Sequence, residues 1–315
     1  MGKLLKFYEK EYKKLLIIPL LMLLLAFAQL GYQYSTTGDF LIKGVGLKGG
    51  TTITINDISQ TQEDIESAIF KSFPEADLNT RTQASLGTLS GYIIDVDIIT
   101  ANSEDNEIKL ISLLDELYPD KIMNDVGEEE TLYKLGTMGS ALGENFFKQT
   151  TIALLIAFLL MGLVVLIYFK TLVPSLAVIL SAASDIIITL AIINMMGMKL
   201  STFGIAGFLL LIGYSVDTDI LLTSKVLKKK EGAVMDKIMI AIKTGFKMSL
   251  TTIIAVIVAW QVSMSVEIQQ IMTIVLIGLL IDIINTWIQN VGLLRLYLEW
   301  KSKKVAKVDH EVKYF

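Results

Sequence analysis

The stretch Thr151–Phe169, TIALLIAFLLMGLVVLIYF, contains no charged residue. As an α-helix it would be about 28 Å long, close to the ~30 Å thickness of the hydrocarbon core of a membrane. Five other apolar runs are long enough to cross that core in the same way. They are Leu15–Leu30, Val173–Met196, Phe203–Leu222, Met248–Met264 and Ile268–Leu296. The sequence therefore predicts six transmembrane helices.

The composition of the 315 residues agrees with a membrane protein. Hydrophobic residues make up 53% of the chain and charged residues 19%, whereas soluble domains have about 25% charged residues. There is no Cys, and the single His, His310, lies in the charged tail, so we expect neither a metal site nor a Cys- or His-based catalytic site. No phosphate-binding Gly-x-x-x-x-Gly-Lys-Ser/Thr loop occurs. We predict that the protein is not an enzyme and has no cofactor.

Basic residues indicate the orientation of the chain. With six spans, the N-terminal flank, the segment after the fourth span and the C-terminal flank share one side, and the short loops opposite carry only Lys199. The positive-inside rule then places both termini in the cytoplasm and the protein in the plasma membrane. The basic residues concerned are Lys3, Lys6, Lys10, Lys13, Lys14, Lys225, Lys228, Lys229, Lys230, Lys237, Lys243, Lys247, Arg295, Lys301, Lys303, Lys304, Lys307 and Lys313.

Four parts are expected along the chain. Residues 1–32 form a cytoplasmic flank and the first helix, which we interpret as a span because no small-residue cleavage site follows it. Residues 33–148 form an extracytoplasmic domain, residues 149–300 a five-helix bundle, and residues 301–315 a cytoplasmic tail. Gln33–Lys148 holds 8 Lys and Arg against 20 Asp and Glu, a net charge of −12. This acidic exterior does not suggest nucleic-acid binding.

The pattern of the extracytoplasmic segment predicts an α+β domain. Strand-like alternation and helical spacing follow one another in the order β-α-β-β-α-β, which is that of the ferredoxin-like fold. Thr61 and Asp64 can cap the first helix. The predicted elements are Thr51–Asn56, Gln62–Phe73, Ala76–Leu86, Ser90–Thr100, Ser103–Leu117 and Ile122–Tyr133. The expected fold class is an α-helical polytopic membrane protein with an extracytoplasmic ferredoxin-like domain.

Four aspartates lie inside the predicted spans: Asp185, Asp217, Asp219 and Asp282. Charged residues at that depth are costly and usually face the interior of a helix bundle. The spans offer no Lys or Arg at comparable depth. Two interpretations stay open. The carboxyl groups could join helices by hydrogen bonds, or they could exchange protons and couple movement to a proton gradient.

Two helix faces carry the polar residues around these carboxyl groups. Asp185 shares a face with Ser181, Ser184 and Thr189. Asp282 begins a polar stripe on the sixth span, and a stripe of this kind must face protein or water. Asp217 and Asp219 point about 200° apart on their helix and cannot serve one partner equally. The stripe consists of Asp282, Asn285, Thr286, Gln289 and Asn290.

Small residues on the fourth span have two interpretations as well. Gly204, Gly207 and Gly213 would let helices approach closely. Gly213 together with Ser215 could also loosen the helix beside Asp217. We expect helix packing at these glycines and keep a hinge at Gly213 as the alternative.

Five stretches in this order along the chain resemble the SecF family of protein-export membrane proteins in its archaeal form. Gly213–Leu227, GYSVDTDILLTSKVL, is similar to the fourth-span signature of that family. The other four are Gly46–Ile55 (GLKGGTTITI), Gly139–Phe146 (GSALGENF), Thr244–Thr252 (TGFKMSLTT) and Asp282–Asn290 (DIINTWIQN). Six spans with one large loop after the first also match the family architecture.

The resemblance implies an auxiliary subunit of the Sec translocase that promotes protein export. Its implied partners are SecD, the SecY channel complex, exported polypeptides and membrane lipids. The SecD/SecF pair belongs to the RND superfamily, and in bacteria it uses the proton gradient. Aligned without gaps, the Asp of bacterial SecF falls on Thr218, and an Asp of SecD falls on Asp217. The resemblance therefore gives the coupling role to Asp217 first and to Asp219 second.

Other classes of protein fit the residues less well. An RND-type exporter of small solutes or ions would normally need two six-span halves, and this chain holds one. A structural subunit that uses its aspartates only for packing is the third possibility. An intramembrane aspartyl protease would need Tyr-Asp and Gly-x-Gly-Asp, where the chain has Ser184-Asp185 and Tyr214-Ser-Val-Asp217.

Overall fold

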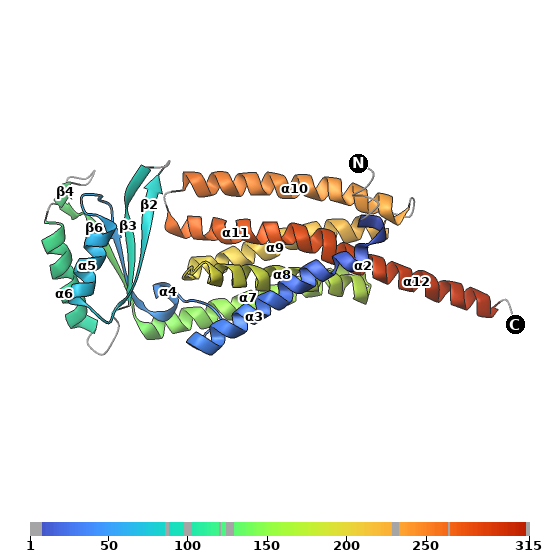
Figure 1. Cartoon of the computed structure of the whole chain (residues 1–315), viewed down its shortest axis with the longest axis horizontal. Coiled ribbons are helices and arrows are strands. Elements are labelled where there is room, and N and C mark those ends of the chain that lie inside the picture. Colours follow the sequence, from blue (N-terminus) through green and yellow to red (C-terminus); the bar gives the residue numbers. More distant parts are fainter. Residues whose placement is uncertain are drawn as a thin grey trace.

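The computed structural model describes residues 8–85, 88–97, 103–119, 121–123, 129–228, 233–263 and 265–312. Within these residues six helical segments are long and apolar enough to cross a membrane, as the sequence predicts. They form one elongated bundle with an α+β domain at one end and both chain termini at the other (Figure 1). Lys3, Lys6, Lys229, Lys230 and Lys313 lie outside the described residues.

The spans are helices; the first is interrupted for one residue at Leu16, and the sixth changes its helix type on the way. They are α2 and α3 (Tyr12–Leu15, Ile17–Thr37), α7 (Ser140–Phe169), α8 (Leu172–Met195), α9 (Thr202–Lys228), α10 (Val234–Val262), and α11, η1 and α12 in succession (Val266–Ile284, Asn285–Asn290, Val291–Val312). Helices α8, α9 and α11 form the centre of the bundle and are buried over about half of their length. Helices α3 and α7 lie at the periphery and expose most of their apolar side chains.

The fifth span is longer than expected. The apolar run begins at Met248, but α10 begins at Val234, so Lys237, Lys243 and Lys247 lie on a helix instead of in a loop. Apolarity marks the part of a helix that lies in hydrocarbon, and lysine side chains let the helix continue beyond it by reaching toward water. For the same reason α12 runs on through the predicted tail as far as Val312.

The α+β domain contains a four-stranded antiparallel sheet. Its strands are β1 (Gly50–Ile55), β2 (Asp77–Ser85), β3 (Thr88–Asp97) and β6 (Tyr133–Met138), in the order β2-β3-β1-β6. Ile53 pairs with Ile94 of β3 on one side and with Leu135 of β6 on the other. With helices between β1 and β2 and between β3 and β6, this is the ferredoxin-like arrangement that the sequence predicts.

The predicted last strand, Ile122–Tyr133, is wrong. That stretch holds a separate two-stranded hairpin of β4 (Lys121–Met123) and β5 (Glu129–Thr131), and β6 closes the sheet only after it. Alternation in β6 is weak, because among its described side chains Tyr133 and Leu135 alone contact the apolar core. Pairing with β1 therefore decides where the last strand lies, and the local pattern does not.

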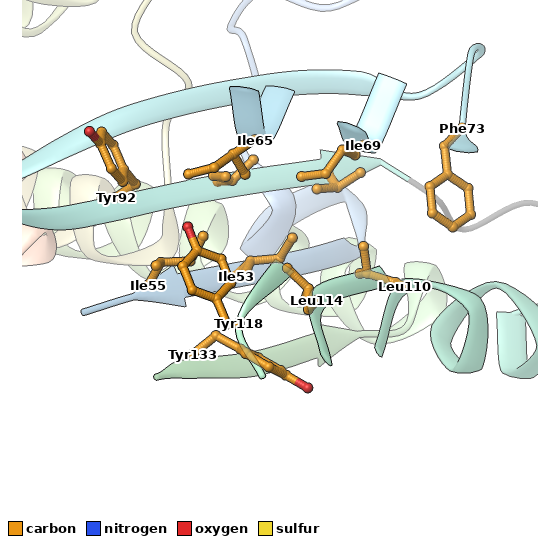
Figure 2. Packing of buried hydrophobic residues seen from close by; sticks show 12 residues of the cluster. Ile53, Ile55, Ile65, Ile69, Phe73, Tyr92, Leu110, Leu114, Tyr118 and Tyr133 are labelled. Carbon is orange, nitrogen blue, oxygen red and sulfur yellow. The ribbon is translucent and has the colours of Figure 1, made fainter. Parts of the chain in front are cut away.

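Helices α5 (Gln62–Ser72) and α6 (Ser103–Leu117) cover the face of the sheet that points away from the bundle (Figure 1). Thr61 and Asp64 form the predicted capping box at the start of α5. The two helices and the sheet enclose an apolar core (Figure 2). It contains Ile53, Ile55, Ile65, Ile69, Phe73, Tyr92, Ile94, Val96, Leu110, Leu114, Tyr118 and Tyr133.

The opposite face of the sheet is polar and points toward the bundle (Figure 1). Asp95 is buried there and accepts hydrogen bonds from Thr52 Oγ1 at 2.8 Å and from Arg81 Nη2 at 2.6 Å. Backbone hydrogen bonds also join the segment before α4 (Val45–Lys48) to the α8–α9 loop. Leu200 N donates to Ile42 O at 2.7 Å, and Leu200 O accepts from Gly44 N at 2.8 Å. The domain is thus fixed to the outer ends of α8 and α9.

Glycines let α9 and α11 approach each other closely. A Cβ atom on Gly207 would lie 3.2 Å from Ile274, and one on Gly278 would lie 2.4 Å from Leu211. At Gly204 a Cβ atom would meet Leu200 at 2.5 Å. These three positions bring the backbones of neighbouring segments together, which larger residues would prevent.

Candidate functional site

Three aspartates from three helices meet inside the bundle. Asp185 lies on α8, Asp219 on α9 and Asp282 near the end of α11, and each is 0% exposed. They lie close enough together for their charges to interact. We call these three residues the carboxyl cluster.

Asp185 is held by side chains from two other helices. Ser215 Oγ on α9 donates to Asp185 Oδ2, and Asn285 Nδ2 donates to Asp185 Oδ1 at 2.7 Å. At the preceding residue of α8, Ser184 Oγ accepts from Gln289 Nε2 at 3.3 Å. The predicted polar face of α8 therefore packs against the predicted polar stripe of the sixth span.

A single hydroxyl connects the other two carboxyl groups. Thr286 Oγ1 lies 2.9 Å from Asp282 Oδ1 and 3.0 Å from Asp219 Oδ1. Asn290 Nδ2 donates to the same Asp219 oxygen at 2.6 Å, and Thr218 Oγ1 donates to Asp282 Oδ2 at 3.3 Å. Since a hydroxyl has one proton and two lone pairs, Thr286 can donate to one carboxyl while accepting from the other.

The four amide and hydroxyl residues of the stripe lie in a π-helix, η1, between α11 and α12. A π-helix closes its turns with i→i+5 hydrogen bonds, so residues five apart share a face. Asn285 and Asn290 are five apart, and they donate to Asp185 and Asp219 respectively. π-Helical turns inside α-helices occur frequently at functional sites.

No described cation lies beside the carboxyl cluster. None of the ion pairs between described residues includes Asp185, Asp219 or Asp282. In the described part of the chain, Asp219 Oδ2, Asn285 Oδ1 and Asn290 Oδ1 are buried without a hydrogen-bond partner. Among the described residues, the hydrogen-bond partners of the three carboxyl groups are therefore hydroxyls and amides, which suits groups that can bind and release protons.

The remaining predicted residues lie apart from the cluster or play a different part in it. Asp217 is exposed on the surface of α9, on the side away from Asp219. A Cβ atom on Gly213 would meet nothing within 4 Å, so no neighbouring helix requires a glycine here, and α9 continues unbroken through this residue. Ser215 is a donor to Asp185.

Sequence reasoning missed the part that Thr218 plays. Ser215, Thr218, Asp219 and Leu222 follow the i, i+3, i+4, i+7 spacing of one helix face, and all four are buried. This spacing could have shown that α9 directs a polar face inward beside Asp219.

The fold and the buried site define a multi-pass helical membrane protein with a ferredoxin-like domain at one end of its helix bundle. The family model "Protein export membrane protein SecD/SecF, C-terminal" matches residues 119–300. The protein-export membrane protein SecF of Pyrococcus furiosus is 35% identical over 94% of this chain and 94% of its own. That of Methanocaldococcus jannaschii is 34% identical over 94% of this chain and 99% of its own. The chain therefore belongs to the SecF family of protein-export membrane proteins.

Membership of this family makes the protein an auxiliary protein-export subunit of the Sec translocase and not an enzyme. Among solved structures, SecDF from Thermus thermophilus, a translocon-associated membrane protein, has a similar fold. Its TM-score is 0.66 at 16% identity, and the match covers 95% of this chain but 38% of that chain. A second SecDF structure, in a super-membrane-facing form, has a TM-score of 0.56 and covers 92% of this chain and 39% of that one.

Proposed function

We propose that this protein acts in a complex with SecD and couples protein export to the proton gradient through Asp185, Asp219 and Asp282. The observation that carries this proposal is the meeting of three carboxyl groups, from three helices, in a buried site without a described counter-ion. Such a site is expensive to keep in a membrane and marks a functional site by default.

The hydrogen bonds supply a route for a proton between two of the carboxyl groups. When Asp282 is protonated, it can donate to Thr286 Oγ1, whose own proton points at Asp219. Transfer along these two hydrogen bonds moves one proton from Asp282 to Asp219 and leaves Thr286 neutral. Asp185 binds Ser215 of α9 and Asn285 of η1, so a change of its charge would alter how α8 holds the other two helices.

SecD is the proposed partner, because this chain corresponds to only part of the similar SecDF chains. The chain matches less than half of the length of the similar SecDF chains, whose name joins SecD to SecF. Asp217 is exposed on α9 within the span, and a carboxyl group exposed to lipid at such a depth is costly. We propose that SecD covers the Asp217 face, and that the complex serves polypeptides leaving the SecY channel, in contact with membrane lipids.

Export by the complex tests the coupling. Membrane vesicles that contain this protein with SecD should export a Sec substrate faster when a pH gradient is imposed. Asp219→Asn and Asp282→Asn keep size and hydrogen bonding but cannot titrate, so each should assemble with SecD and lose this stimulation. Asp217→Asn, at an exposed residue of the same helix as Asp219, is the matched control. Full stimulation in both buried variants would overturn proton coupling and leave hydrogen-bonded packing as the role of the cluster.

We also propose that both termini lie in the cytoplasm and that the α+β domain is extracytoplasmic. Because the chain has no Cys, a single introduced Cys is a clean reporter. Ser112 on α6 and Ser302 on α12 are both exposed and lie at opposite ends of the molecule (Figure 1). An impermeant thiol reagent should label Ser112→Cys in intact cells and Ser302→Cys only after lysis. The reverse pattern would overturn the orientation.

A further inference from the structure

The N-terminal segment contacts the π-helix from the end of the bundle that carries both termini. Tyr8 is half-buried, and its hydroxyl group donates a hydrogen bond to the backbone carbonyl of Trp287, in the middle of η1. Its ring packs on an apolar cluster that includes Trp287 itself and Val291. The contact joins two parts of the chain that are 279 positions apart.

A second set of contacts fixes the segment that carries Tyr8. Arg295 Nη2 donates to Glu9 O at 2.9 Å, and Tyr12 Oη donates to Glu299 Oε1 at 2.5 Å. Leu16 lies against Gly292, where a Cβ atom would be 2.6 Å from its side chain. The segment is thus attached to α12 at several points, and of its described residues Tyr8 is the one that hydrogen-bonds to η1.

The carbonyl of Trp287 lies in the one stretch of the span that departs from the α-helix. π-Helical turns are rare, so contacts with neighbouring segments can decide between this register and the α-helical one. The hydrogen bond from the Tyr8 hydroxyl group is such a contact, because it restrains the direction of the Trp287 carbonyl. In this register the stripe meets the carboxyl cluster, with Thr286 and Asn290 on Asp219 and Asn285 on Asp185.

We propose that Tyr8 is a positioning residue, whose hydroxyl group holds η1 in the register that directs Asn285, Thr286 and Asn290 at the carboxyl cluster. The inference rests on the proposed function for its consequence in export, and on the hydrogen bonds alone for its structural part. Burial raises the pKa of the Tyr8 phenol to about 12, so the hydroxyl keeps its proton and remains a donor throughout the physiological range.

The test compares two variants that each remove one phenol hydroxyl from the same segment. Tyr8→Phe removes the bond to η1, and Tyr12→Phe removes a bond to α12 instead. Hydrogen–deuterium exchange of the purified full chain in lipid nanodiscs reports on the backbone of residues 285–291. Infrared spectra over a pH series report on the hydrogen bonding of the carboxyl C=O groups, and the band of the cluster is the one that Asp282→Asn removes or shifts.

Tyr8→Phe should speed exchange over residues 285–291 at least tenfold and should shift the carboxyl band, while Tyr12→Phe leaves both as in the wild type. An unchanged carboxyl band in Tyr8→Phe would overturn the proposal, and so would equal changes in both variants, since general loosening of the segment would then suffice. Neither measurement uses export. If the band shifts but no variant of the cluster affects gradient-stimulated export, the positioning role stands and the proposed coupling fails.

Discussion

The α+β domain, called the external domain here because it lies outside the helix bundle, and the bundle itself bury different side chains at their centres. The core of the external domain is built from Ile, Leu, Val and aromatic side chains, and its buried Asp95 is paired with Arg81 on the other face of the sheet. The centre of the bundle holds carboxyl, amide and hydroxyl groups, while large apolar side chains such as Leu159 and Leu25 are exposed on its surface. Both regions bury apolar clusters, but only the bundle, among the described residues, adds a connected group of polar side chains at its centre.

The difference follows from the solvent around each region. In water, burial of apolar surface stabilises a fold by about 25 cal/mol per Å². In lipid the hydrophobic effect does not drive helices together, because lipid tails are as apolar as the helix surfaces. Close packing and hydrogen bonds between helices hold the bundle together instead. Interior polar groups are therefore compatible with stability in the bundle, and they are free to serve the function.

The largest expected effect lies in the core of the external domain. Ile94 is fully buried on β3, and Ile94→Ala should destabilise the domain by about 2–5 kcal/mol, because the surrounding side chains cannot fill the cavity. The matched change Leu159→Ala, at a residue 70% exposed on α7, should cost less than about 0.5 kcal/mol. Thermal unfolding of the two purified variants measures both. Equal losses would contradict the contrast between the two interiors.

Packing between α9 and α11 should come next. Gly278→Leu places new atoms where Leu211 already lies, 2.4 Å from the position of a Cβ atom, and Leu211 is fully buried. We expect a loss of about 1–3 kcal/mol from overpacking, seen as a lower yield of folded protein in detergent. Gly213→Ala meets open space and should be neutral or slightly stabilising. A harmful Gly213→Ala would point to a hinge at this residue after all.

The polar interior of the bundle allows a smaller, more selective change. Thr286→Val keeps the shape of the side chain but removes the hydroxyl between Asp219 and Asp282, so it should cost about 1–2 kcal/mol and slow gradient-stimulated export. Thr251→Val removes an exposed hydroxyl that bonds only to its own helix, and it should have no effect on either. An inert Thr286→Val would show that the two carboxyl groups do not depend on this connection.

The smallest expected effect is the loss of stability of the external domain at high pH. In the external domain, burial raises the pKa of Tyr118 and of Tyr133 to about 12, and a hydrogen bond to Asp115 adds to the effect at Tyr133. The folded state therefore favours the neutral phenol. The stability that this gives is fully present below pH 10 and is lost as the pH rises from about 10 to about 12.

Alkaline unfolding of this domain should therefore set in above about pH 10, and Tyr118→Phe with Tyr133→Phe should flatten its pH dependence. Circular dichroism during a pH titration of the wild type and the double variant measures this. The same pH dependence in both proteins would contradict the role of the two phenols.

Local pattern was a good guide where one periodicity or one long apolar run dominates. The spans, the capping box of Thr61 and the first five elements of the external domain could all be predicted in this way. Local sequence pattern was wrong where contacts with other segments, or the extent of the hydrocarbon, determine the element. The last strand lies at Tyr133–Met138 because β1 pairs with it there, and α10 begins at Val234 because a helix can continue outside the hydrocarbon.

The sequence by itself determined that this chain crosses a membrane six times, carries a ferredoxin-like domain, belongs with the SecF family and places costly carboxyl groups in its spans. Only the tertiary structure decided which of these groups meet. Asp185, Asp219 and Asp282 come from segments up to 97 positions apart, and their juxtaposition depends on how α8, α9 and α11 pack, with the glycines of α9 and α11 setting the distance. The π-helix that presents Thr286 and Asn290 depends likewise on neighbours, because i→i+5 bonding has no signature in local sequence that would favour it over the α-helix.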